Sequence, residues 1–184
     1  MNKEALRTEG LALRDGLSPD FREAASQAIM QRVLDLPELA TPGIVSAYWP
    51  IRSEVDPRPL LEALDCRGVV LSLPRVNHPF LSFHEWRPGE PLQLMGFGVS
   101  EPMDEAQAVL PDVLLMPLAR FDRARNRIGY GKGHYDRAIA GLTERKAILT
   151  IGLAFSVQET ETIPVEDHDR RLDLVVTEAE TIRA

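Results

Sequence analysis

Short, continuous runs of apolar residues constrain the fold of this chain more than any other feature of its sequence. The runs cover residues 44–49, 69–73, 113–116, 147–155 and 172–177. Strands have this pattern when both of their faces are buried, as they are in a parallel sheet covered by helices on both sides. Helical spacing of apolar residues fills several of the intervening segments. The sequence therefore predicts an α/β fold with a mainly parallel sheet, although the pattern does not give the order of the strands.

The helical segments have recognisable boundaries. Helices are predicted over residues 2–15, 19–36, 60–64 and 133–141, and a partly exposed strand over residues 81–86. Ser18 is a suitable N-cap for the second helix, and Pro19 fits its first position. The first helix is polar, with a thin apolar stripe at Leu6, Leu13 and Leu17.

Length and charge limit the class of protein. A chain of 184 residues suits a single domain, which we expect to span residues 1–184. The 21 Lys and Arg against 28 Asp and Glu give a net charge of −7, so no broad surface for a nucleic-acid backbone is expected. An RNA-associated or scaffolding module is the alternative from another class. The acidic balance and the lack of an aromatic-basic motif count against it.

The single cysteine, Cys66, allows neither an intrachain disulfide nor a cysteine-based zinc site. This usage fits a reducing compartment, and we expect a cytoplasmic protein. No apolar run approaches the roughly 20 residues that cross a bilayer, and the first residues lack the apolar stretch of a signal peptide. We therefore expect a soluble monomer or weak homodimer with small-molecule partners and neither nucleic acid nor membrane as a partner.

The chemistry concentrates in a glycine-rich segment that follows a buried strand and precedes a helix. Gly129, Gly131 and Gly133 stand at alternate positions, where they let the backbone approach a ligand and turn its amides toward an anion. The helix start beyond them adds a positive dipole end. Lys132 lies among the glycines, where its ammonium can reach a phosphate, and Arg127 precedes them. The segment matches neither a Walker loop nor a Rossmann fingerprint.

Two interpretations of this segment remain open on composition alone: a phosphate site and a plain surface loop with solvated charges. Tyr130 and Tyr135 favour a shaped pocket, because bulky rings alternate with the glycines. Asp136, one turn into the helix, suits a Mg²⁺ ion shared with phosphate oxygens. The cluster of Arg120, Arg123, Arg125 and Arg127 is usually a solvated loop, although part of it can attract anionic ligands here.

The segment resembles the signature of the 5-formyltetrahydrofolate cyclo-ligase family, also called 5,10-methenyltetrahydrofolate synthetase. That signature is Phe-Asp, a short turn, then Arg-aliphatic-Gly-x-Gly-x-Gly-aromatic-Tyr-Asp. It is matched at 121–122 and 127–136, except that His134 replaces the usual aromatic residue. Further matches lie in family order along nearly the whole chain. They are Lys3 and Arg7, Tyr48 with Pro50 and Glu54, residues 73–76, 97–98 with 101–102, and His168 and Asp169 with 172–173 and 176–178.

The resemblance implies a three-layer α/β/α fold and an enzyme that uses ATP and Mg²⁺. Such an enzyme closes 5-formyltetrahydrofolate into 5,10-methenyltetrahydrofolate and releases ADP and phosphate. Phosphorylation of the formyl oxygen would activate it as a leaving group before N10 attacks. A site of this kind needs positioned cations more than a strong nucleophile. A non-catalytic or repurposed paralogue that binds a nucleotide or pterin is the alternative.

Carried over residue by residue, the resemblance implies that Arg127 and the loop after it bind the ATP phosphates. The loop residues are Gly129, Tyr130, Gly131, Lys132, Gly133, His134 and Tyr135. Lys132, Arg127 and Tyr135 would be catalytic. Lys3 and Arg7 would add charge, their alternative being a solvated helix face.

The remaining implied roles concern metal and folate. Asp136 and Asp173 look like Mg²⁺ carboxylates, the alternative for Asp173 being a turn residue before a strand, and Asp169 is a weaker candidate. Glu54 and Tyr130 would contact the folate, with an exposed loop acid as the alternative for Glu54. Trp49 would line the pterin slot unless it belongs to the core.

Overall fold

A sheet of eight strands organises the chain, and its central strands run parallel. The computed structural model describes residues 2–183, and of Phe97 it describes only the backbone. The parallel strands are β1 (Ile44–Ser46), β2 (Val70–Asn77), β7 (Val113–Pro117), β10 (Leu149–Leu153) and β11 (Leu174–Val176). The antiparallel strands at the edges are β3 (Phe80–Glu85), β6 (Ala108–Val109) and β12 (Thr181–Ile182). The order is β12-β11-β10-β7-β1-β2-β3-β6, which confirms the predicted, mainly parallel sheet.

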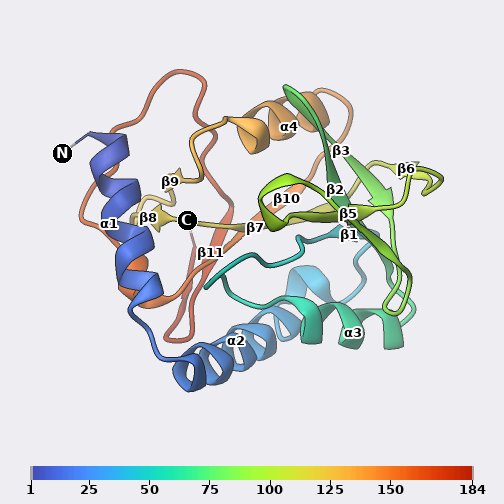
Figure 1. Ribbon diagram of the computed structural model, residues 1–184, viewed down its shortest axis with the longest axis horizontal. Helices are drawn as coiled ribbons and strands as arrows, with labels where there is room; N and C mark the ends of the chain where they lie inside the picture. The colour runs from blue at the N-terminus through green and yellow to red at the C-terminus, as the bar shows by residue number, and fades with distance from the viewer. Residues whose placement is uncertain (1, 184) are drawn as a thin grey trace.

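Helices cover both faces of this sheet, and the alternation along β7 shows how. Val113 and Leu115 pack with α2 (Pro19–Leu34) and α3 (Arg58–Cys66), whereas Leu114 and Met116 pack with α4 (His134–Thr143). In Figure 1, α2 and α3 lie below the sheet and α4 lies above it. Both faces of the strand are buried, so its sequence is apolar throughout. The expected three-layer α/β/α arrangement is confirmed.

Helix α1 (Lys3–Asp15) lies at the side of the sheet, against β8 (Arg120–Phe121) and β9 (Arg127–Ile128) (Figure 1). Its buried face is Leu6, Gly10 and Arg14, and Leu13 is 37% exposed, so the predicted stripe was wrong at Leu13. A Cβ atom on Gly10 would stand 2.2 Å from the carbonyl oxygen of Ala119. Only glycine at this position lets α1 approach the chain so closely.

Several short elements were not predicted. They are the edge strands β6 and β12, the hairpins β4 (Leu92–Leu94) with β5 (Ser100–Pro102) and β8 with β9, and the 3-10 turns η1 (Pro37–Leu39), η2 (Gly96–Gly98) and η3 (Ser156–Gln158). Predicted strands also differ in length, since β2 extends to Asn77, whereas β1, β10 and β11 are shorter than the predicted 44–49, 147–155 and 172–177. No helix in the described part of the chain is both long and apolar enough to span a membrane.

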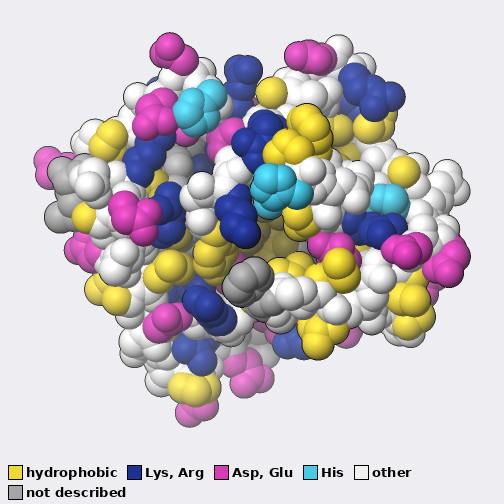
Figure 2. Space-filling model, turned by 45° about the horizontal axis from the view of Figure 1, so that its top comes forward, with side chains coloured by type: hydrophobic (Ala, Val, Ile, Leu, Met, Phe, Trp, Pro, Cys, Tyr) yellow, Lys and Arg dark blue, Asp and Glu magenta, His cyan; other side chains and the backbone are white. Residues whose placement is uncertain are grey.

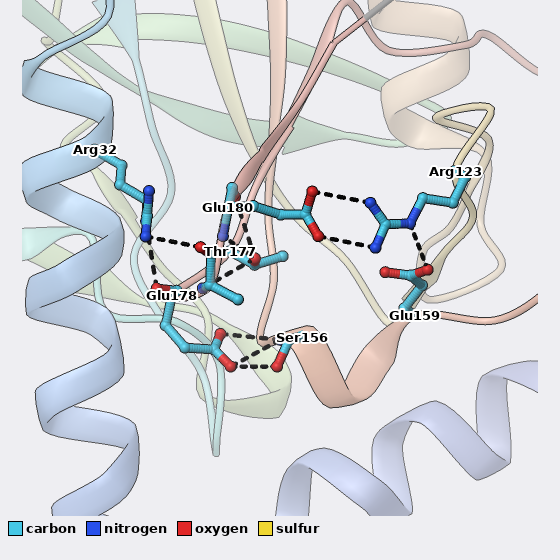
Figure 3. A network of polar contacts seen from close by, with 8 residues as sticks. Arg32, Arg123, Ser156, Glu159, Thr177, Glu178 and Glu180 are labelled. Atoms are coloured by element: carbon cyan, nitrogen blue, oxygen red, sulfur yellow. Dashed lines mark hydrogen bonds and ion pairs between the residues drawn. The ribbon is translucent and has the colours of Figure 1, made fainter.

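A polar network fixes the turn between β11 and β12 (Figure 3). Glu178 accepts a 2.9 Å hydrogen bond from the backbone N–H of Ser156, and Arg32 of α2 donates to two backbone carbonyls of the turn. The guanidinium of Arg123 donates two hydrogen bonds, of 2.8 and 2.9 Å, to the carboxylate of Glu180. The network joins the C-terminal strands to α2 and to the loop after β8. None of these five residues lines the cleft described next.

Candidate active site

The main cleft opens at the carboxyl ends of the central parallel strands. The chain runs from β1 to β2 on one side and from β7 to β10 on the other, so the strand order reverses between β1 and β7. Ligands in open α/β sheets bind at such reversal points. Tyr48 and Trp49 follow β1, Pro74 and Val76 lie in β2, and Pro117 ends β7, and all five line the cleft.

The cleft has a volume of about 350 Å³, within the range of small-molecule sites. Figure 2 shows a hollow with hydrophobic side chains in its depth and Lys, Arg and His side chains around it. An apolar floor with charges at the rim can hold a flat ring system next to an anionic group.

The glycine loop forms one wall, and its backbone conformation requires glycine at two positions. Gly131 and Gly133 have φ of +85° and +61°, a region that other residues rarely adopt. A Cβ atom on Gly131 would also stand 2.9 Å from a guanidinium nitrogen of Arg7. Gly133 is the N-cap of α4, and it lines the cleft. The positive end of the α4 dipole therefore lies at the cleft.

Helix α1 brings two cations to the same wall. Lys3 donates a 2.6 Å hydrogen bond to Asp169 and lies 3.3 Å from Glu166, while Nε of Arg7 donates to the carbonyl of Gly129 at 2.8 Å. Partial burial lowers the pKa of Lys3, but its bonds to the two carboxylates outweigh this and raise it overall. Both side chains line the cleft, so the pair is not a solvated helix face.

Arg127 and Asp136 form an ion pair inside the cleft. The guanidinium donates to Oδ1 of Asp136 at 2.8 Å, and the backbone N–H of Arg170 donates to the same oxygen at 3.1 Å. Arg127 also donates to the carbonyl of Arg170. The bonds from the Arg127 side chain and from the Arg170 backbone both end on Oδ1 of Asp136. Oδ2 of Asp136 is therefore left for a ligand.

Of the four clustered arginines, only Arg127 lines the cleft. Arg120 is 5% exposed and pairs with Glu9 of α1. Arg123 belongs to the network of Figure 3, and Nε of Arg125 donates to a backbone carbonyl. The expected attraction for anions therefore rests on Arg127.

Tyr130 of the glycine loop meets Glu54 at a neighbouring wall of the cleft. The Tyr130 hydroxyl donates to Oε1 of Glu54 at 2.8 Å, and the backbone N–H of Ile51 donates to Oε2 at 2.9 Å. Glu54 is only 7% exposed and lines the cleft, so it is not an exposed loop acid. Burial raises the pKa of Glu54. Burial, followed by the nearby Glu54 charge, raises the pKa of Tyr130 to about 12.

Aromatic side chains complete this wall. Trp49 lines the cleft and also packs edge-on against Trp86 of the core, with ring centroids 5.6 Å apart. It therefore lines the cleft and packs against the core at the same time. Tyr135 faces the cleft from the first turn of α4, and burial raises its pKa further than that of Tyr130. Both phenols are therefore neutral hydrogen-bonding groups at ordinary pH.

His134 stands at the start of α4 with one ring nitrogen unused. Its Nε2 is buried and has no hydrogen-bond partner among the described residues. The ring packs edge-on against His78 at 5.9 Å, and burial, followed by the Arg137 charge, lowers its pKa. A neutral imidazole in the cleft keeps the flat surface of the aromatic residue that it replaces.

The two predicted metal carboxylates are not brought together. Asp136 lines the cleft, but Asp173 does not, and Oδ2 of Asp173 accepts hydrogen bonds from the backbone N–H and hydroxyl of Thr150 at 2.8 and 2.7 Å. The described residues contain no cluster of three or more metal-binding side chains. A Mg²⁺ ion bound with nucleotide needs only one or two carboxylates besides phosphate oxygens and water. Asp136, with its unused oxygen, fits that requirement.

Sequence reasoning missed part of the cleft and its support. Tyr48 entered the argument only as a motif position, and Val99 and Ser100 of the β4–β5 hairpin were not considered, yet all three line the cleft. The buried Arg14, behind the wall, was also missed. The positions of Lys3, Arg7, Gly10 and Arg14, at i, i+4, i+7 and i+11, were a signal for one shared helix face.

Fold and site together define an α/β protein with a glycine-rich loop and several cations beside an apolar cleft at the carboxyl ends of its parallel strands. A family model, the 5-formyltetrahydrofolate cyclo-ligase family, matches residues 1–178. The chain belongs to this family.

Relatives of known name agree with this assignment. The 5-formyltetrahydrofolate cyclo-ligase of Haemophilus influenzae is 32% identical over 175 residues, covering 91% of this chain and 92% of that protein. The Escherichia coli protein of the same name is 33% identical, covering 89% and 93%. The solved structure of Aquifex aeolicus 5,10-methenyltetrahydrofolate synthetase has a TM-score of 0.85 at 33% identity, covering 100% of this chain and 93% of that one.

Proposed function

We propose that this chain catalyses the ATP-dependent cyclisation of 5-formyltetrahydrofolate to 5,10-methenyltetrahydrofolate, with release of ADP and phosphate, in the cleft described above. One observation carries the proposal for the site: the glycine loop that bears Lys132 also brings Tyr130 onto the buried Glu54, and all three residues line a single cleft. A phosphate site and a site for a flat, polar ring system therefore adjoin.

The reaction explains why both parts are needed. A formamide oxygen is a poor leaving group, so it first attacks the γ-phosphorus of ATP, and ADP departs. The carbon of the phosphorylated formyl group is then attacked by N10 of the same molecule. The N10 proton is lost, the C–O bond breaks, and phosphate leaves with the bonding electrons. Holding N10 beside the activated carbon makes the second step effectively unimolecular.

The phosphate wall supplies positioned positive charge. Arg127, Lys132 and the amides of the glycine loop would hold the phosphates, and Lys3 and Arg7 would add charge from α1. Charge builds up on the transferring group, so preorganised cations stabilise the transition state. A magnesium ion held by Asp136 would neutralise phosphate charge in the same place.

The neighbouring wall, around Glu54, would hold the folate. Trp49 offers a face for the pterin, and Tyr130 and Tyr135 would flank the formyl group. The Glu54 carboxylate would stabilise the positive charge that the methenyl product carries and accept the N10 proton. Burial raises its pKa above that of an ordinary glutamate, which makes the carboxylate a better proton acceptor.

A repurposed paralogue that binds nucleotide or pterin without closing the ring is the alternative, since a shared site does not guarantee a shared substrate. The test mixes purified protein with 5-formyltetrahydrofolate, ATP and Mg²⁺ and follows the near-ultraviolet absorbance of methenyltetrahydrofolate. ATP-dependent growth of that band, lost on addition of EDTA, supports the proposal. ATP binding without product formation would favour the paralogue.

A further inference from the structure

Arg14 lies behind the cleft, at the end of α1, and is the most deeply buried cation among the described residues. It is 1% exposed and does not line the cleft. One of its terminal nitrogens donates to the Tyr130 hydroxyl at 3.0 Å, and the other lies 4.0 Å from Oε1 of Glu54. A single guanidinium thus approaches both members of the pair that faces the folate slot.

The rest of the side chain is held by the turn that carries Glu54. Nε of Arg14 donates to the hydroxyl of Ser53 at 3.0 Å, and that hydroxyl in turn donates to the carboxylate of Asp15. Two successive residues of α1 therefore fix Ser53, directly before Glu54. The guanidinium plane is fixed at one end by Ser53 and at the other by Tyr130.

We propose that Arg14 is a positioning residue for the cyclisation: it sets the direction of the Tyr130 hydroxyl and holds the Glu54 carboxylate ionised and in place. This inference rests on the proposed function for its readout. The nitrogen nearest Glu54 is buried without a hydrogen-bond partner among the described residues, and it forms a 4.0 Å ion pair with that carboxylate. In this low-dielectric interior its charge acts on Glu54 with little screening by solvent.

A planar, permanently charged fork is suited to this task. Arginine presents donors in fixed directions, so binding at Ser53 and Tyr130 leaves one N–H direction for Glu54. Lysine carries the same charge but a single donor centre. Arg14→Lys therefore keeps the charge and loses the geometry, while Arg14→Met loses both and keeps most of the volume.

The test compares the two Arg14 variants with Arg120→Met. Arg120 is also a buried arginine against α1, bonded to Glu9 at 2.9 Å, but it has no contact with Glu54 or Tyr130. Each variant's folded fraction is measured first, and kcat and KM are expressed per folded molecule. Arg14→Met should lower kcat about 10²-fold, as expected when a reacting group is misplaced by an ångström, with KM for ATP nearly unchanged. Arg14→Lys should recover part of the loss, and Arg120→Met should leave kcat within about twofold.

A double-mutant cycle separates positioning from a purely structural role. In a Tyr130→Phe, Glu54→Gln background, the effect of Arg14→Met on kcat should shrink, because residues that act together are not additive. The acid limb of the pH profile of kcat/KM should also move to higher pH in Arg14→Met. The other groups that interact electrostatically with Glu54 are Arg52, Tyr48, Tyr130 and Tyr135. Arg14→Met keeps all four.

The outcomes are distinct. An unchanged kcat in Arg14→Met, an equal loss in Arg120→Met, or an undiminished effect in the double background would each overturn the inference. If Arg14→Met does not fold, Ser53→Ala, which removes the bridge to Arg14, enters the same cycle with the same expectations. A wild-type protein that forms no methenyl product defeats the proposed function instead. Arg14 is then tested by binding of 5-formyltetrahydrofolate alone, which Arg14→Met should weaken and Arg120→Met should not.

Discussion

Lys132 is the residue on which the phosphate assignment depends most. It stands between two glycines in left-handed conformations, so the direction of its backbone is set by residues that few others can replace. Its side chain lines the cleft beside Arg127 and Asp136. At this scale the structure places a long cationic side chain on a backbone of fixed direction, as the proposed phosphoryl transfer would require.

Replacing Lys132 with Ala should lower kcat by a factor on the order of 10² or more, because one preorganised charge contact to the transition state is lost. The melting temperature should barely change, since the loop lies outside the core. Steady-state kinetics and a thermal melt check both expectations. The control is Arg145→Ala, which replaces an exposed cation in the turn just after α4 and should be neutral. Near-normal turnover in Lys132→Ala would remove this residue from the mechanism.

Glu54 should give the reaction an unusual pH dependence. Its pKa is raised by burial, so the carboxylate forms at higher pH than an ordinary glutamate, whose pKa is about 4.3. The acid limb of kcat/KM should lie correspondingly high and disappear in Glu54→Gln, which should also be slow at every pH. The exposed Glu62 offers the control variant Glu62→Gln, which should keep the wild-type profile. An acid limb that persists unchanged in Glu54→Gln would assign it to another group.

The raised pKa of Glu54 also makes the stability of the fold depend on pH. The sign of this dependence is opposite to that of a salt-bridged acid, whose pKa is lowered on folding. Between the unfolded and the raised folded pKa of Glu54, the folded state binds more protons than the unfolded chain. The free energy of unfolding therefore falls as pH rises through this window. The window begins at about pH 4.3, the pKa of an unfolded glutamate, and ends at the raised pKa of folded Glu54. Denaturant unfolding at several pH values should show the difference between Glu54→Gln and wild type moving in favour of the variant across the window. A constant difference would contradict the assignment.

At the scale of elements, α1 decides how the two walls meet. Lys3 and Arg7 line the cleft, Gly10 touches the chain at Ala119, and Arg14 reaches the Glu54–Tyr130 pair, all from one face of the helix. A displacement of α1 would disturb both walls at once.

A methyl group at position 10 is the smallest change that moves this helix. In Gly10→Ala the Cβ atom would overlap the carbonyl of Ala119, so we expect a loss of about 1–3 kcal/mol in the free energy of unfolding and a raised KM for ATP. Gly141→Ala is the matched control, since that helical glycine has no atom within 4 Å of the added Cβ and should gain up to about 1 kcal/mol. Denaturant unfolding and ATP kinetics measure both effects. Equal behaviour of the two variants would show that the contact at Gly10 is not limiting.

The elements that the sequence predicted are those with a local cause. The spacing in α2 and the continuous apolar runs of β7 and β10 depend on near neighbours and on burial on both faces. The β4–β5 hairpin was missed because its strands are short and its Leu94 is 75% exposed, so it shows no regular pattern. Strand order depends on contacts between distant segments, which periodicity does not encode.

The site also has a part that was predictable from neighbouring residues and a part that depends on contacts between distant segments. The glycine loop is a continuous segment, and its motif predicted both the cations and the helix that follows. The pairing of Glu54 with Tyr130 joins residues 76 positions apart, and the burial of Arg14 depends on both. Charged side chains are normally expected at the surface, so nothing local indicated a buried arginine. Asp173 was assigned to metal by motif, whereas its carboxylate caps Thr150.

At the scale of the whole molecule, the cleft draws its lining from nearly the full length of the chain. Its residues run from Lys3 in the first helix to Asp169 before the last long strand, and they include both hairpins. Ligands in the cleft therefore contact segments that would separate on unfolding.

Nucleotide binding should accordingly stabilise the whole fold. ATP with Mg²⁺ at 100 times its Kd should add about 2.7 kcal/mol to the free energy of unfolding and raise Tm. The shift should shrink on adding EDTA and in Lys132→Ala. Thermal melts with and without ligand measure it. A shift of equal size in EDTA would show that the metal at Asp136 does not contribute to nucleotide binding.

The pairing of the cleft's cations with carboxylates also bears on the ionic conditions in which the protein works. Four side chains of each sign line the cleft: Lys3, Arg7, Arg127 and Lys132 against Glu54, Asp136, Glu166 and Asp169. An open basic surface attracts mobile anions from solution and loses affinity steeply as salt rises. Here carboxylates already pair with Lys3, Arg7 and Arg127, so few small anions are displaced from these three cations when a nucleotide enters. ATP affinity should therefore vary little with ionic strength, and sulfate or chloride should compete poorly for the cleft.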